Sequence, residues 1–182
     1  MNTALELLKY TIPALIVLIS SYIIVHKFLV TQLQKKQLAL LKDTQDITIR
    51  LRLQAYERFV LFIERMQPRQ LIPRVYEPGM TAGDLQQALV FNIRTEFEHN
   101  LAQQIYVSRQ VWETVKGVME QELNMINLVS QRVDSGASAK ELHSRIIDYI
   151  ITVETELPTD VALQIINDEA KRVLSYGSTA PA

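Results

Sequence analysis

The feature that most constrains this chain is an apolar stretch near its N-terminus. Between Lys9 and Lys27 lie 17 residues without a formal charge, counting His26 as neutral. With the apolar residues that follow Lys27, about 20 residues at ~1.5 Å each make a helix of ~30 Å, which matches the hydrocarbon core of a bilayer. The stretch is apolar on all sides, so it predicts a transmembrane helix over residues 9–30.

Two other interpretations of this stretch fit the residues less well. A cleaved signal peptide has small residues at its cleavage site, whereas Glu6 precedes this stretch and it ends in the bulky run "SSYIIVHKF". A buried core helix needs a domain that surrounds it, and the remaining ~150 residues rarely form one. We therefore expect an uncleaved anchor, with Tyr10 and Tyr22 toward its two interfaces.

Basic residues after the stretch predict its orientation. Only Lys9 precedes the span, whereas Lys27, Lys35, Lys36 and Lys42 follow it closely. Basic segments are retained in the cytoplasm, so we expect the N-terminus outside and the C-terminal domain inside. Lys27, Lys35 and Lys36 would also anchor the helix at the lipid headgroups. The pattern therefore predicts a protein that crosses its membrane once.

The net charge of −1 hides an uneven distribution. Residues 27–74 carry 10 basic and 4 acidic side chains, while residues 75–182 carry 8 basic and 15 acidic ones. The basic part would face anionic lipid headgroups, and the acidic part would repel nucleic acid. The chain has no cysteine, which excludes disulfides, thiolate metal ligands and a thiol nucleophile.

The rest of the chain is patterned for helices. It has few breakers, 5 Gly and 6 Pro in all, and apolar residues recur at helical spacing. The run "ITIRLRLQ" at 47–54 also alternates as a strand would, but the helical pattern continues past it, so a helix is favoured. The predicted fold class is all-α: an N-terminal transmembrane helix that continues into a long helix, followed by a compact helical bundle.

The predicted segments follow from these patterns and from the positions of proline and glycine. They are an N-terminal tail (1–8), the transmembrane helix (9–30), a juxtamembrane long amphipathic helix (31–66), a packed proline-rich linker (67–83), the helical bundle (84–176) and a disordered tail (177–182). Within the bundle, Thr81 and Asp84 predict a capped helix start, and a break near Ser108 opens the next helix. That helix carries one apolar ladder with a single polar member, Glu122, which we expect at the edge of the buried face.

No cofactor motif is present. Glycine-rich phosphate loops, zincin motifs and calcium loops are absent, so no cofactor, catalytic residue or metal ligand is predicted, and no small-molecule substrate is evident. The nearest approach to chemistry is Glu96 and His99, spaced as in the Glu-x-x-His of di-iron bundles. That chemistry needs two such motifs, and this chain has one.

Two polar clusters, at residues 52–70 and 96–108, are better interpreted as a structural network or an interaction surface. Glu96 would find basic partners among Arg50, Arg52 and Arg58 on the long helix, and such pairs fix helix register. The candidate residues of this network are Arg52, Tyr56, Glu57, Arg58, Glu96, His99, Asn100 and Gln103.

The segments "RLQAYERFVLFIERMQP" and "EFEHNLAQQIYVS", followed by Trp112 and preceded by one span, carry a resemblance. They resemble an uncharacterised family of Gram-negative bacterial single-pass membrane proteins. The resemblance implies an inner-membrane location and no known activity.

We therefore expect a non-enzymatic, membrane-anchored cytoplasmic scaffold or adaptor. Its expected partners are the lipid bilayer and a protein, either another chain or itself, and not nucleic acid. Two alternatives stay open. One is a membrane-bound helical-bundle enzyme or metal-binding protein that uses Glu96 and His99, and the other is a coiled-coil homo-oligomer through residues 30–66.

Overall fold

The structure is a computed structural model that describes residues 2–152 and 157–178. Its helices are α1 (Asn2–Met66), α2 (Pro68–Val75), α3 (Ala82–Asn100), the 3-10 helix η1 (Leu101–Tyr106), α4 (Arg109–Ser130), α5 (Ala139–Thr152) and α6 (Pro158–Ser178). The described residues contain no β-strand, only an isolated bridge between Thr81 and Ser138. The predicted all-α fold, with a long N-terminal helix and a bundle, is confirmed, and residues 47–54 are helical rather than extended.

Helix α1 begins earlier than predicted. Residues 2–8, expected as a tail, are helical because this segment contains strong helix formers and no glycine or proline, while Met1 lies outside the described residues. At the other end of the chain, α6 continues through Ser178, so the predicted tail over 177–182 starts too early, and residues 179–182 lie outside the description.

The chain divides into two units, residues 1–47 and 48–182, and the boundary falls inside α1. In the first unit, α1 is long and apolar enough from Thr11 onward to cross a membrane, and none of its most apolar 18-residue window is buried. Tyr22 is exposed and its ring lies 5.9 Å from that of His26. Lys27, Lys35 and Lys36 are exposed too, whereas the side chain of Tyr10 lies outside the described ones.

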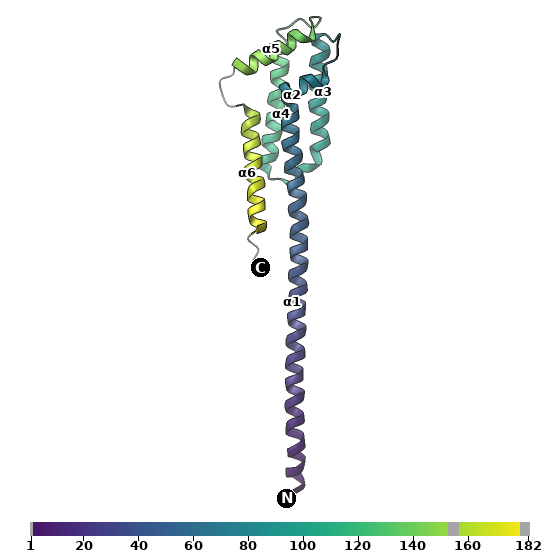
Figure 1. Ribbon diagram of the computed structural model, residues 1–182, viewed down its shortest axis with the longest axis vertical. Coiled ribbons are helices and arrows are strands. Elements are labelled where there is room, and N and C mark those ends of the chain that lie inside the picture. The colour runs from purple at the N-terminus through teal and green to yellow at the C-terminus, as the bar shows by residue number, and fades with distance from the viewer. Residues whose placement is uncertain (1, 153–156, 179–182) are drawn as a thin grey trace. The chain divides into compact units, whose positions relative to one another are not determined.

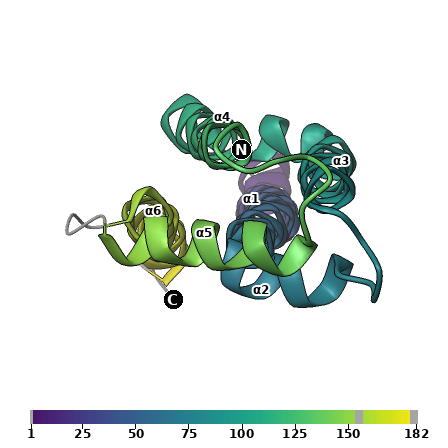
Figure 2. The same ribbon diagram turned by 90° about the horizontal axis from the view of Figure 1, so that it is seen from above.

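The second unit is a helical bundle. The end of α1 and helices α3, α4 and α6 are seen nearly end-on in Figure 2, with α5 and α2 crossing them (Figures 1 and 2). Helix α4 packs on both α3 and α6, and α5 contacts α3 and α4. Each helix carries an apolar stripe that these neighbours bury.

The core of this unit is centred on the end of α1. Its Tyr56, Phe59, Phe62 and Met66 are at most 2% exposed. The ring of Phe59 lies 6.0 Å from that of Trp112 on α4, within the range of favourable aromatic pairs. The other large, fully buried side chains come from α1, α2, α3, α4 and α5: Ile63, Leu71, Ile72, Leu85, Leu89, Ile93, Ile126 and Leu142.

The predicted packed linker over 67–83 contains a helix. Residues Pro68–Val75 form helix α2, which buries Leu71 and Ile72 against the bundle. The N–H of the first residue of a helix has no partner within that helix. Proline lacks this N–H, so Pro68 starts α2 without losing a hydrogen bond. The burial of these side chains makes 67–75 part of the bundle rather than a connection beside it.

Helix α3 begins with the predicted capping pair. The Thr81 hydroxyl accepts a hydrogen bond from the Asp84 N–H at 3.2 Å, and the Asp84 carboxylate accepts one from the Thr81 N–H at 3.0 Å. This reciprocal pair satisfies two backbone donors that the helix itself cannot. The bond from the Thr81 N–H also lowers the pKa of Asp84 below its ordinary value.

Replacing Thr81 with alanine should lower the free energy of unfolding of the second unit by about 1 kcal/mol, the usual cost of losing an N-cap. Thermal unfolding of the full chain, followed by the fluorescence of its one tryptophan, Trp112, measures this change. Thr114→Ala, the same substitution inside α4, is the control and should change stability by less than about 0.5 kcal/mol. Equal losses in both variants would contradict the role of the cap.

Candidate functional site

The predicted site residues separate into two clusters and several isolated side chains. Arg52 and Tyr56 join a network built around Glu169, which the sequence did not single out. Glu96 lies in a different ion-pair cluster. The structure therefore does not unite the candidates in one site.

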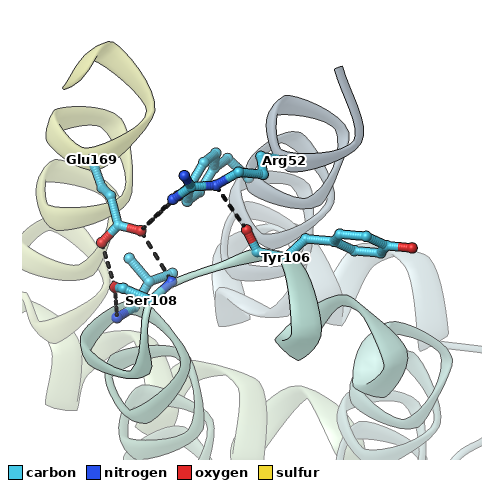
Figure 3. A network of polar contacts seen from close by, with 6 residues as sticks. Arg52, Tyr106, Ser108 and Glu169 are labelled. Atoms are coloured by element: carbon cyan, nitrogen blue, oxygen red, sulfur yellow. Dashed lines mark hydrogen bonds and ion pairs between the residues drawn. The ribbon is translucent and has the colours of Figure 1, made fainter. Parts of the chain in front are cut away.

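The first cluster joins three helices and is shown in Figure 3. The Tyr56 hydroxyl on α1 donates to Glu169 Oε1 on α6 at 2.6 Å and accepts from Arg52 Nη2 at 3.0 Å. The Ser108 N–H, at the start of α4, donates to Glu169 Oε1 at 3.1 Å, and the Ser108 hydroxyl donates to Glu169 Oε2. We call Arg52, Tyr56, Ser108 and Glu169 the Glu169 network.

Arg52 ties the network to the turn before α4. Its Nε donates to the backbone carbonyl of Tyr106 at 3.2 Å, while the Tyr106 ring points away from the network (Figure 3). Arg52 Nη2 also lies 3.9 Å from Glu169 Oε1. One guanidinium therefore contacts α1, η1 and α6 at once, which only the fork of an arginine allows.

The electrostatics of the network favour a charged carboxylate and a neutral phenol. Burial, and then the hydrogen bond to Glu169, raise the pKa of Tyr56 to about 12. Burial opposes ionisation of Glu169 too, but hydrogen bonds from Ser108 and Tyr56 and the charge of Arg52 outweigh it and hold its pKa below the ordinary value. Neither group changes charge near neutral pH.

This geometry makes the Glu169 network a structural clamp rather than a catalytic group. A serine nucleophile needs a neighbouring base whose pKa is near the working pH, and Glu169 is too acidic for that role. Ser108 is moreover engaged as the N-cap of α4, because its hydroxyl accepts from the Val111 N–H at 3.2 Å.

The second cluster surrounds Glu96 on α3. Its Oε1 lies 3.1 Å from Arg65 Nη1, and its Oε2 lies 3.7 Å from Arg74 Nη2. The prediction that Glu96 pairs with Arg50, Arg52 or Arg58 is wrong. Arg65 lies about two to four helical turns further along α1, and Arg74 belongs to α2, in the segment predicted as a packed linker.

The other candidates do not extend either cluster. Glu57, Arg58 and His99 are exposed, and the Asn100 side-chain amide donates to the Glu96 carbonyl at 2.8 Å. Gln103 lies in η1, because α3 ends at Asn100 and the helical spacing from Glu96 and His99 stops there. With both Glu96 oxygens beside guanidinium groups, the carboxylate is placed for ion pairs rather than for a metal.

Replacing Glu96 with glutamine should cost about 0.5–1 kcal/mol of stability at low salt, because Arg65 and Arg74 are both at least one-third exposed and water screens these pairs. Raising the salt concentration should narrow the difference from the native chain. Glu98→Gln, an exposed neighbour on α3, is the control and should be neutral at both salt concentrations. A salt-independent loss at Glu96 would contradict the ion-pair interpretation.

Sequence reasoning missed the surroundings of Glu122. This residue lines a cavity of about 370 Å³ between α4, α5 and the start of α6, and its Oε2 is buried with no hydrogen-bond partner among the described residues. Burial raises the pKa of Glu122 to about 7. Its position on the apolar ladder of α4 is the sequence evidence for a shielded side chain. From that ladder we expected Glu122 only at the edge of the buried face.

Across residues 2–152 and 157–178, no group of three or more His, Cys, Asp or Glu side chains is arranged to hold a metal ion. The class that fold and site define is an all-α protein with one helix capable of crossing a membrane and a clamped helical bundle. The chain matches a family of unknown function, DUF7935, over residues 2–173, and it belongs to that family. No curated protein and no solved structure matches it.

Proposed function

We propose that this chain is a single-pass protein of a bacterial inner membrane, whose helical unit acts in the cytoplasm as a scaffold or adaptor for another protein. The observation that carries the proposal is the apolar surface of α1 in the first unit. Side chains such as Ile16 and Leu18 are more than half exposed, and a bilayer is the medium that favours their exposure. The orientation rests on the lysines that follow the span.

Because neither Tyr56 nor Glu169 changes charge near neutral pH, the Glu169 network favours a structural role over acid–base catalysis at that site. The network holds α1, α4 and α6 at fixed relative positions, and a scaffold needs such rigidity to present one surface. Phe91 on α3 and Ile105 in η1 are 68% and 73% exposed, and they are the places where we expect a partner to contact the bundle.

Membrane extraction and a topology reporter test the anchor. The full chain should stay with membranes through an alkaline carbonate wash, and removal of residues 1–30 should release it. A fluorescent protein fused to the C-terminus should fold, while a periplasmic phosphatase there should be inactive. Release of the full chain by carbonate would contradict the anchor, and an active phosphatase would contradict the orientation.

Site-specific photocrosslinking in intact cells tests the adaptor role. A photoreactive residue at Phe91 or Ile105 should give one discrete adduct, whereas the same residue at exposed Glu77 should not. Equal adduct patterns at all three positions would count against a specific partner surface.

The exposed apolar residues of α1 support self-association through a segment shorter than residues 30–66. Leu33, Leu40 and Ile47 are spaced by seven and are each at least 61% exposed. From Ala55 to Met66, however, the apolar face of α1 is buried in its own bundle. Disulfide crosslinking of a Leu40→Cys variant in membranes tests a parallel pair, and an exposed Leu38→Cys variant is the control.

A further inference from the structure

The cavity beside Glu122 has the features of a small-molecule site. Its volume is about 370 Å³, within the range of ligand pockets in proteins. Met125 and Leu128 from α4, Tyr149 and Ile150 from α5, and Leu157 supply walls that are mostly apolar. Glu122 is the one Asp, Glu, Lys or Arg side chain in this lining.

The carboxylate of Glu122 is unusual for its surroundings. Its Oε2 is shielded from solvent and accepts no hydrogen bond from the described residues, although buried polar atoms in folded proteins nearly always have a partner. No described ion pair within 4.0 Å includes it. A cation or a strong hydrogen-bond donor brought into the cavity would stabilise the charged carboxylate.

We propose that this cavity binds a small organic amine, with the protonated nitrogen against Glu122 and the apolar body against Met125, Leu128 and Ile150. Charge complementarity selects a cation over an anion, and the apolar walls select an amine with a hydrocarbon body over ammonium or a metal ion. The proposal does not depend on membrane anchoring or on an adaptor role.

Binding should become stronger as pH rises. Glu122 has a pKa of about 7 in the free protein, so it must lose a proton to pair with the ammonium group. The other titratable groups near it are Tyr149 on α5 in this cavity, and Arg69 on α2 and Asp160 on α6 in the adjoining cavity of about 220 Å³.

Ligand titration of the full chain in lipid nanodiscs tests the proposal with three probes that share one ring: cyclohexylamine, cyclohexanol and cyclohexanecarboxylate. The amine should bind saturably and at least about tenfold more tightly than the alcohol or the acid, as expected for one charge-assisted hydrogen bond. Its affinity should rise from pH 6 to pH 8. Empty nanodiscs correct for partition into lipid.

Two variants assign the binding to this cavity. Glu122→Gln keeps the shape of the side chain and should weaken the amine at least about tenfold while leaving the alcohol unchanged. Leu128→Trp should fill the cavity and weaken all three probes. Glu120→Gln, on the exposed side of α4, is the matched control and should bind as the native chain does.

Three results would overturn the proposal. The amine gives no saturable binding to the native chain; Glu122→Gln binds the amine as tightly as the native chain; or the acid binds more tightly than the amine. The last result would indicate that a protonated Glu122 pairs with a carboxylic acid instead.

Discussion

Replacing Glu169 with alanine should lower the free energy of unfolding of the second unit by about 2–3 kcal/mol. The substitution removes the acceptor of three hydrogen bonds, from the Tyr56 hydroxyl and from the N–H and hydroxyl of Ser108. Tyr56 is 2% exposed, so its hydroxyl would lose its acceptor with little access to water. A buried polar group left without a partner is more destabilising than the average hydrogen bond is stabilising.

Denaturant unfolding followed by Trp112 fluorescence measures this loss. The indole stacks at 5.4 Å on Phe97 inside the bundle, so its emission reports on the packing that the network supports. Asp168→Ala, on the exposed side of the same helix, should change stability by less than about 0.5 kcal/mol. Glu169→Gln should be intermediate, because its amide keeps one acceptor oxygen. A loss at Glu169 no larger than at Asp168 would show that the clamp contributes nothing.

The loss of stability caused by Glu169→Ala should become smaller as pH falls. The folded-state pKa of Glu169 is lowered, so its stabilising contribution is fully present above the unfolded-state pKa of about 4.3 and disappears as pH falls through the folded-state value. The native chain and Glu169→Ala should therefore differ most at neutral pH and converge in acid. Unfolding curves from neutral pH to below pH 4 test this convergence.

Helical spacing was sufficient to predict most of the bundle core. Leu85, Leu89, Ile93, Phe97 and Leu101 are spaced by four, which predicts one apolar ladder along a helix. Leu85, Leu89 and Ile93 of this ladder are buried in α3. The ladder fails at Leu101, which is 44% exposed, because α3 ends at Asn100 and the chain continues as a 3-10 helix. Spacing describes one helix at a time, and it contains no information on where tertiary packing ends that helix.

The Glu169 network could not be predicted in the same way. Tyr56 and Glu169 are 113 residues apart, and their contact depends on how α6 packs against α1 and α4. The sequence did single out Arg52, Tyr56 and the break at Ser108, which are three of its four members. The fourth is one of 15 acidic residues in the chain beyond Arg74, and only the packing distinguishes it.

Glu122 shows a different limit of sequence-based prediction, because its position in the sequence does indicate that it lies on a packed face. It occupies the apolar ladder of α4 together with Val115, Val118 and Ile126, all of which are buried. A side chain at such a position lies on the packed side of the helix, and Glu122 is half-buried there. A long charged side chain can often reach water from the edge of a face, but here α5 and the start of α6 cover one of its oxygens.

Replacing Glu122 with glutamine should stabilise the second unit increasingly as pH rises. Burial raises the folded-state pKa of Glu122 to about 7, so the native chain is favoured below the unfolded-state pKa of about 4.3 and loses stability as pH rises through 7. Glutamine carries no charge at any pH. From about pH 5 to about pH 8, the difference in the free energy of unfolding between variant and native chain should grow by about 2.5 kcal/mol in favour of glutamine.

Measuring the difference in the free energy of unfolding at several pH values separates the ionisation of Glu122 from contributions that do not change with pH. Glutamine also buries an amide without an assigned partner, which shifts the whole curve by a constant but leaves its slope unchanged. Glu120→Gln should give a flat difference, because the Glu120 side chain is 57% exposed and pairs only with Lys116 at 3.9 Å among the described ion pairs. A flat curve for Glu122 as well would mean that its carboxylate is solvated. The cavity would then lack the desolvated charge on which recognition of an amine depends.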